Sequence, residues 1–201
     1  MFVQIIQGHV RDAEQLKAAM DQWVRDLSPD ASGWTGTTGG VTEDGDFIGL
    51  ASFTDPESAH RNSERPEQDR WWQRTSQLFD GDVTFRETFD VMTDHPGDPN
   101  RATFVQIMQG QGRDHDRALE LMSQDTEEWA TFRPDVLGTT ACSYGDGEYT
   151  VAVYFTSEKD ARAGEKKEPP PGLAKQMSEM DHLNIRKPSF YDLHTPWIQA
   201  P

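Results

Sequence analysis

The sequence predicts an α+β fold made of two tandem copies of one βαββαβ unit. The segment FVQIIQG at 2–8 returns as FVQIMQG at 104–110, a displacement of 102 residues. The same displacement carries four further short matches, namely Arg11-Asp12, Gly36-Thr37-Thr38, Asp44-Gly45 and Phe53-Thr54. In each copy, apolar residues alternate along short segments and recur at helical spacing between them. Matches that keep one displacement indicate a duplicated structural unit.

The first copy has the element order strand, helix, strand, strand, helix, strand. The strand at 2–7 is apolar on both faces and is followed by an amphipathic helix. Asp-Gly at 44–45 between two extended runs predicts a hairpin. A second helix begins after Asp55 and is interrupted at Pro66, which removes a helical hydrogen bond. The last strand, 83–91, alternates again. This order is typical of a ferredoxin-like unit.

The second copy repeats the order and sets the domain boundaries. We expect strands at 103–109, 136–143, 148–155 and 183–193, with helices at 114–129 and 173–181. We assign 1–94 to the first ferredoxin-like repeat, 95–102 to a linker, 103–194 to the second repeat and 195–201 to a C-terminal tail. Strands that are apolar on both sides need cover on both faces. We therefore expect the two repeats to pack sheet to sheet as a single-chain α+β barrel, so that the protein is a monomeric pseudo-dimer or a weak homodimer.

Composition limits the partners and the compartment. The formal charge of −16 and the pI near 4.6 argue against nucleic acid and anionic membranes, which attract positive surfaces. Cys142 is the only cysteine, so no intrachain disulfide is expected. The first residues lack the pattern of a signal peptide, and no apolar run is long enough for a membrane span. These features favour a cytoplasmic protein.

The repeat order, the FVQI strand and the broken second helix with adjacent Trp71 and Trp72 resemble the dimeric α+β barrel superfamily. Within it, the chain is similar to antibiotic-biosynthesis-monooxygenase-like (ABM-like) proteins in tandem form, over nearly its whole length. That superfamily includes cofactor-free monooxygenases of polycyclic phenols, haem-degrading enzymes, isomerases and proteins without a known activity. The resemblance implies that a ligand lies between the sheet and the helices of one half.

The resemblance also implies a set of site residues in the first repeat. Asn62, Trp71 and Arg86 look like the asparagine, tryptophan and arginine of the monooxygenases, which would hold a phenolate and stabilise charge passing to oxygen. The candidate substrate-binding residues are Trp34, His60, Arg65, Trp72 and Glu87. Gln4 also borders this space, but its return as Gln106 is better explained by the shared fold.

Structural explanations compete with several of these roles. Trp71 and Trp72 fit the core of an amphipathic helix, but adjacent positions lie about 100° apart, so one of the two should line a cavity or an interface. Asn62 and Arg65 are also explained as partners for carbonyl groups freed at the helix break. Arg86 alternates with the apolar residues of its strand, which is typical of a solvated side chain.

Glu87 is unusual because it shares a strand face with Phe85 and other apolar residues. If that face is covered, the carboxylate is buried and needs a partner or a raised pKa, and it then suits a general base. A strand bulge that turns the side chain outward is the alternative. At the displacement of 102 residues, the second repeat has Ser189 in its place.

The differences between the copies favour a functional site in the first repeat. Asn62, Arg65 and Trp71 are matched by Gly164, Lys167 and Leu173, so the second repeat is expected to keep at most an apolar pocket. We expect a cofactor-independent monooxygenase or a binder of a small aromatic metabolite. The alternatives are a non-catalytic binding or stress-associated protein and, third, haem binding through His60. The histidines show no short spacing typical of metal ligands, so neither a metal nor a cofactor is expected.

Overall fold

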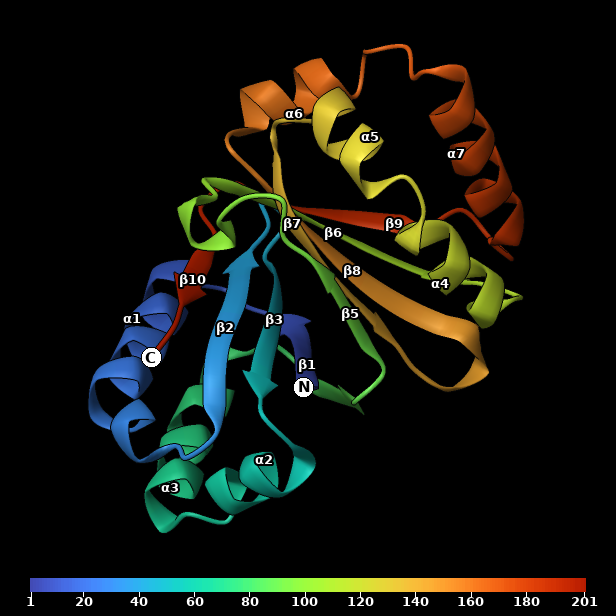
Figure 1. Ribbon diagram of the computed structural model, residues 1–201. Coiled ribbons are helices and arrows are strands. Elements are labelled where there is room, and N and C mark those ends of the chain that lie inside the picture. Colours follow the sequence, from blue (N-terminus) through green and yellow to red (C-terminus); the bar gives the residue numbers. More distant parts are fainter. The chain divides into compact units, whose positions relative to one another are not determined.

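The computed structural model describes residues 1–201 and divides into two compact units. Repeat 1 comprises Met1–Val91 together with Thr195–Pro201, and repeat 2 comprises Met92–His194. Each contains a five-stranded sheet with helices (Figure 1). The predicted α+β fold of two tandem ferredoxin-like repeats is confirmed. No helix combines the length and the apolar character that crossing a bilayer requires.

Repeat 1 has the strand order β10-β2-β3-β1-β4. Its elements are β1 (Phe2–His9), α1 (Ala13–Asp26), η1 (Ser28–Asp30), β2 (Trp34–Val41), β3 (Asp46–Phe53), α2 (Pro56–Ser63), α3 (Pro66–Thr75), η2 (Ser76–Leu78), β4 (Thr84–Thr88) and β10 (Trp197–Gln199). The predicted helix break is present, because α2 ends at Ser63 and α3 begins at Pro66, where proline's missing N–H has no cost.

Repeat 2 has the strand order β5-β7-β8-β6-β9. Its elements are β5 (Val91–Asp94), η3 (Pro99–Arg101), β6 (Phe104–Gln111), α4 (His115–Ser123), α5 (Thr126–Phe132), β7 (Val136–Ser143), η4 (Gly145–Gly147), β8 (Glu148–Phe155), α6 (Glu158–Gly164), α7 (Pro171–Leu183) and β9 (Ser189–Leu193). The single helix expected at 114–129 is two helices, and Asp125 between them has a left-handed backbone.

Each sheet receives one strand from beyond the βαββαβ unit. The run 83–91, expected as one strand, is instead β4 followed by β5, and β5 lies beside β7 in the sheet of repeat 2. The segment expected as a tail contains β10, in which Trp197 pairs with Gly39 of β2. The Trp197 ring also stacks on Phe47, with 5.9 Å between the centroids. The C-terminal residues therefore complete the sheet of repeat 1.

The core of repeat 1 lies between its sheet and the helices α1 and α3, which are on one face of β1, β2 and β3 (Figure 1). Phe2 and Ile6 of β1 point to this face, where they pack with helix residues such as Trp23 and Leu16. Because side chains alternate along a strand, Val3 and Ile5 point to the opposite face, and both are also buried. The strand is thus apolar on both faces, as predicted.

Repeat 2 has three more residues between the starts of α6 and α7 than repeat 1 has between the starts of α2 and α3, and these residues shift the alignment of the two repeats from that point on. The displacement of 102 residues holds from β1 and β6 to α2 and α6, but Pro66 at the start of α3 corresponds to Pro171 at the start of α7. The strand register shows the same shift, since Gln4 pairs with Glu87 while Gln106 pairs with Asp192. The match of Glu87 to Ser189 was therefore wrong.

Candidate functional site

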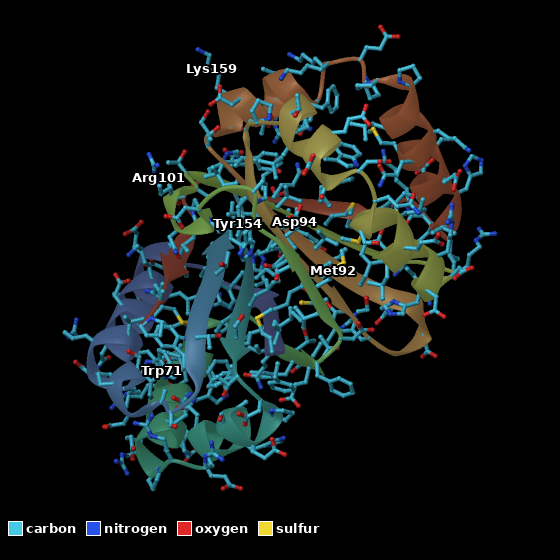
Figure 2. The ribbon with its side chains drawn as sticks, viewed as in Figure 1. Trp71, Met92, Asp94, Arg101, Tyr154 and Lys159 are labelled. Carbon is cyan, nitrogen blue, oxygen red and sulfur yellow. The ribbon has the colours of Figure 1, made fainter.

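Three tryptophans form the interior of repeat 1. Trp23, Trp34 and Trp71 are 9%, 5% and 6% exposed, so none of them is a surface group. The Trp23 ring lies 5.2 Å from Trp34 in a T-shaped contact and 6.5 Å from Trp71. Figure 2 shows Trp71 on α3, among the side chains between the helices and the sheet.

Each of these three indole N–H groups has a partner inside the repeat. Trp71 Nε1 donates to the backbone oxygen of Ala19 at 3.0 Å, and Trp34 Nε1 donates to Thr37 Oγ1 at 3.0 Å. Trp23 Nε1 donates to Gln68 Oε1 at 2.5 Å. Buried polar groups that are satisfied in this way stabilise a core. Trp34 and Trp71 thus pack in the core, and their indole N–H groups are already used in hydrogen bonds within the repeat.

Trp72 lies in a different environment from its neighbour. It is half-buried, and its ring packs against Phe85 of β4 in a T-shaped contact with centroids 5.2 Å apart, and against Phe79 at 6.1 Å. Phe85 is 46% exposed. Of the two adjacent tryptophans, Trp72 is therefore the one whose surroundings reach the surface, and it presents an aromatic wall together with Phe85.

Glu87 stands on the same strand face as Phe85. Residues Phe85 and Glu87 pair with Ile6 and Gln4 of β1, whose side chains point towards the helices. Gln4 Nε2 donates to Glu87 Oε1 at 2.8 Å, which fixes the orientation of the carboxylate. Glu87 is nevertheless exposed. The carboxylate therefore faces the helix side of the sheet but stays exposed. The expectation that Glu87 is buried on this face does not hold.

Repeat 2 contains the same glutamine and carboxylate with an added cation. Gln106 Nε2 donates to Asp192 Oδ1 at 2.8 Å, and Arg162 of α6 donates to Asp192 Oδ2. The Arg162 guanidinium also lies 5.2 Å above the ring centroid of Phe104. The position of Arg162 is occupied in repeat 1 by His60, which is exposed on α2. Glu87 thus keeps the glutamine contact of its counterpart, but it does not form the ion pair with an arginine that Asp192 forms.

Asn62 and Arg65 are brought together at the junction of α2 and α3. Asn62 is 6% exposed, and its Oδ1 accepts a hydrogen bond of 3.1 Å from Arg65 Nη1. Arg65 Nη1 also donates to the backbone oxygen of Leu27 at the end of α1, and its Nε donates to Glu67 at 2.8 Å. The hydrogen bond from the Arg65 side chain lowers the pKa of Glu67. Arg65 Nη2 is buried without a hydrogen-bond partner.

Arg86 lies on the other face of the sheet. It pairs with Ile5 and lies between Phe85 and Glu87 on β4, so its side chain points away from the helix side. The structure therefore joins Asn62 to Arg65 and places Trp72, Phe85 and Glu87 on one face, but it does not bring Arg86 to either group.

Sequence reasoning missed two features of these sites. Phe85 was regarded only as a strand residue, although its ring forms a wall with Trp72. The pairing of Arg162 with Asp192 was hidden by the three-residue shift between the repeats. The repeated glutamine was the available signal, because a polar residue kept at the same place in both copies marks a shared polar contact.

Comparisons with known proteins support the fold. No family model matches the sequence, and no curated protein is similar enough to count as a match. A crystal structure of a "putative monooxygenase" from Fusobacterium nucleatum is 10% identical with a TM-score of 0.76, covering 99% of this chain and 94% of that one. One from Lactobacillus acidophilus is 12% identical with a TM-score of 0.71, covering 98% of each chain.

An anthrone oxidase-like protein is similar over the full length as well. It is 9% identical with a TM-score of 0.69, covering 100% of this chain and 91% of the other. At these identities the likeness concerns the fold. The chain therefore shares the fold of these three proteins over its full length.

Proposed function

We propose that repeat 1 binds a small aromatic molecule and oxygenates it without a bound cofactor. The proposed site, called the repeat 1 site below, consists of Gln4, Trp72, Phe85 and Glu87. The observation that carries the proposal is the Glu87 carboxylate, which Gln4 holds at 2.8 Å on the same strand face as the Trp72–Phe85 pair and which has no cationic partner. The shared fold with monooxygenase-named proteins agrees with this choice.

Binding rests on the two aromatic side chains. The T-shaped arrangement of Trp72 and Phe85 leaves Phe85 46% exposed, so a third ring can pack against the pair. Aromatic pairs of this kind contribute about 0.5–1.5 kcal/mol beyond the burial of their area. The site therefore favours a planar aromatic molecule over an aliphatic one.

Proton removal is the proposed role of Glu87. A general base needs a carboxylate that is not already neutralised, and Asp192 in repeat 2 is paired with Arg162 whereas Glu87 is not. A proton that passes from an acidic ring CH2 to Glu87 leaves an electron-rich carbanion. The carbanion gives one electron to O2, and the two radicals join in a C–O bond. The peroxide anion takes the proton back from Glu87, and the resulting hydroperoxide loses water. The net change converts CH2 and O2 to C=O and H2O.

Asn62, Trp71 and Arg86 remain a competing catalytic set. Arg65 Nη2, on the guanidinium that bonds Asn62, is a buried N–H group available to donate a hydrogen bond to a substrate oxygen. Replacing Asn62, Trp71 or Arg86 singly with alanine in the assay below separates this set from the repeat 1 site. A loss of turnover in these variants that exceeds the loss in Glu87→Gln would assign the chemistry to them.

The test measures binding and oxygen uptake separately. Binding of anthrone is followed by tryptophan fluorescence, and turnover is followed with an oxygen electrode and by the absorbance of the anthraquinone formed. Glu87→Gln should keep affinity within about threefold and lower turnover by about 10²-fold or more, because general base catalysis contributes about 10²–10⁴-fold. Trp72→Ala should weaken binding about tenfold.

Asp192→Asn is the matched control, since it changes the counterpart carboxylate in repeat 2. It should alter neither quantity by more than about twofold, as expected for a distant, independent site. Unchanged turnover in Glu87→Gln would refute the role of the base. Binding without oxygen uptake in the wild-type protein would instead support the non-catalytic alternative, and unchanged affinity in Trp72→Ala would remove the site itself.

A further inference from the structure

Repeat 2 contains a cavity of about 310 Å3 on the side of α6. Its lining consists of Pro134, Asp135, Thr156, Asp160, Ala163, Gly164 and Lys167. This volume is at the lower end of the range of small-molecule sites. The lining includes three charged side chains, those of Asp135, Asp160 and Lys167.

The internal repeat explains why the cavity exists. Asp55 and Ser157 cap the corresponding helices α2 and α6, so Arg61 and Asn62 of repeat 1 correspond to Ala163 and Gly164 of repeat 2. Repeat 2 therefore lacks two long polar side chains on this helix. A Cβ atom at Gly164 would collide with the Arg133 guanidinium, so Arg133 fills part of the space that Asn62 occupies in repeat 1.

The space that Ala163 leaves open corresponds to a guanidinium in repeat 1. There, Arg61 Nη2 donates to Ser58 Oγ at 2.8 Å, and Ser58 is 3% exposed. The counterpart of Ser58 is Asp160, so repeat 2 has lost the cation and has gained a carboxylate at the position that the cation contacted.

The charges around the cavity show which carboxylate is available. Asp135 is 7% exposed and accepts hydrogen bonds from Arg133 Nε, at 3.0 and 3.2 Å, and from Nη2 at 2.7 Å, so the two charges neutralise each other. Asp160 Oδ2 accepts from the hydroxyl groups of Ser157 at 2.6 Å and Thr156 at 3.0 Å. These hydroxyls lower the pKa of Asp160, which is therefore ionised at neutral pH.

Lys167 is the remaining charged group of the lining. Its Nζ donates to the backbone oxygen of Phe132 at 3.4 Å, and the residue is exposed. The positive charge of Lys167 repels a cationic ligand. Removing this charge should therefore increase the affinity of the cavity for a cation.

We propose that this cavity binds the guanidinium group of a small organic cation, with the Asp160 carboxylate as its partner. The bound guanidinium takes the place that Arg61 occupies in the other repeat. A guanidinium suits the site because its N–H groups can make charge-assisted hydrogen bonds to Asp160 Oδ1, the oxygen that Ser157 and Thr156 do not occupy. An anion is disfavoured by the Asp160 carboxylate, since Asp135 is already paired with Arg133.

The experiment titrates the full-length protein with methylguanidinium and observes the amide signals of residues 156–167 by NMR. Methylurea, which has nearly the same shape and no charge, is the ligand control. Methylguanidinium should shift these signals in a saturable way, and methylurea should not. Equal binding of the two ligands, or no saturable shift with methylguanidinium, would overturn the proposal.

Four variants locate the binding. Ala163→Arg restores the arginine of repeat 1, whose guanidinium would occupy the ligand's place, so this variant should abolish binding. Asp160→Ser should weaken binding at least about tenfold, as expected for the loss of a charge-assisted hydrogen bond. Lys167→Met should tighten binding about two- to threefold, and Glu168→Gln, an exposed carboxylate outside the lining, should leave it unchanged. Wild-type affinity in both Ala163→Arg and Asp160→Ser, with unchanged circular dichroism, would refute the site.

Discussion

Trp71 and Gln176 occupy equivalent places in the two repeats and make the same contact. Trp71 Nε1 donates to the carbonyl oxygen of Ala19, and Gln176 Nε2 donates to that of Leu121, which lies 102 residues after Ala19. The counterpart of Trp71 is therefore Gln176 and not Leu173. The contact joins α3 to α1 in repeat 1 through an indole, and it joins α7 to α4 in repeat 2 through an amide.

Gln176→Ala should destabilise the protein more than Trp71→Phe. Gln176 is 8% exposed and also accepts a hydrogen bond of 2.6 Å from Trp129 Nε1, so its loss leaves a buried donor unpaired at a cost of about 1–3 kcal/mol and adds a cavity. Trp71→Phe keeps an aromatic ring and removes one donor, at about 1–2 kcal/mol. Urea unfolding of both variants measures the difference. Equal midpoints would contradict this ranking.

Gly164→Ala should destabilise repeat 2 by about 1–3 kcal/mol, the usual cost of overpacking. The added methyl group meets the Arg133 guanidinium, which Asp135 holds on the other side. Gly145→Ala is the matched control, because nothing lies within 4 Å of a Cβ atom there. Thermal unfolding should show a lower Tm for Gly164→Ala alone. An unchanged Tm would show that Arg133 moves aside freely.

The contribution of Asp55 to stability should disappear in acid. Its hydrogen bonds to Thr54 and Ser58 lower its pKa below the ordinary value of 3.8. A carboxyl whose folded pKa is lowered adds stability above the unfolded pKa and loses it as the pH falls through the folded pKa. The difference in unfolding free energy between the wild type and Asp55→Asn should be constant from about pH 6 to 8 and shrink below about pH 4. A difference that does not shrink as the pH falls from about 4 to about 2 would refute this assignment.

Removing the Trp197 ring should loosen repeat 1, although the residue follows repeat 2 in the chain. Trp197 pairs with Gly39 and stacks on Phe47, so Trp197→Ala removes half-buried area worth about 1–2 kcal/mol. Hydrogen exchange of the β2 amides at 37–39 should become faster. Phe89→Ala, at a side chain that is 80% exposed, is the control and should leave this exchange unchanged. Equal exchange in both variants would show that β10 does not protect β2.

The sequence determined the duplicated βαββαβ order and the main strands, because alternation, helical spacing and turn residues act over a few neighbouring positions. It also placed the break at Pro66, where proline's effect is local. The same local signals separated Trp71 from Trp72, since two adjacent helical positions cannot face the same way.

Only the tertiary structure decided which distant residues meet. The pairing of Gln4 with Glu87, the opposite orientation of Arg86 and the equivalence of Trp71 with Gln176 all depend on strand register and on the three-residue shift between α2–α3 and α6–α7. The addition of β10 to β2 joins residues from opposite ends of the chain. Such contacts are selected by the packing of the whole unit, and no short stretch of sequence carries that information.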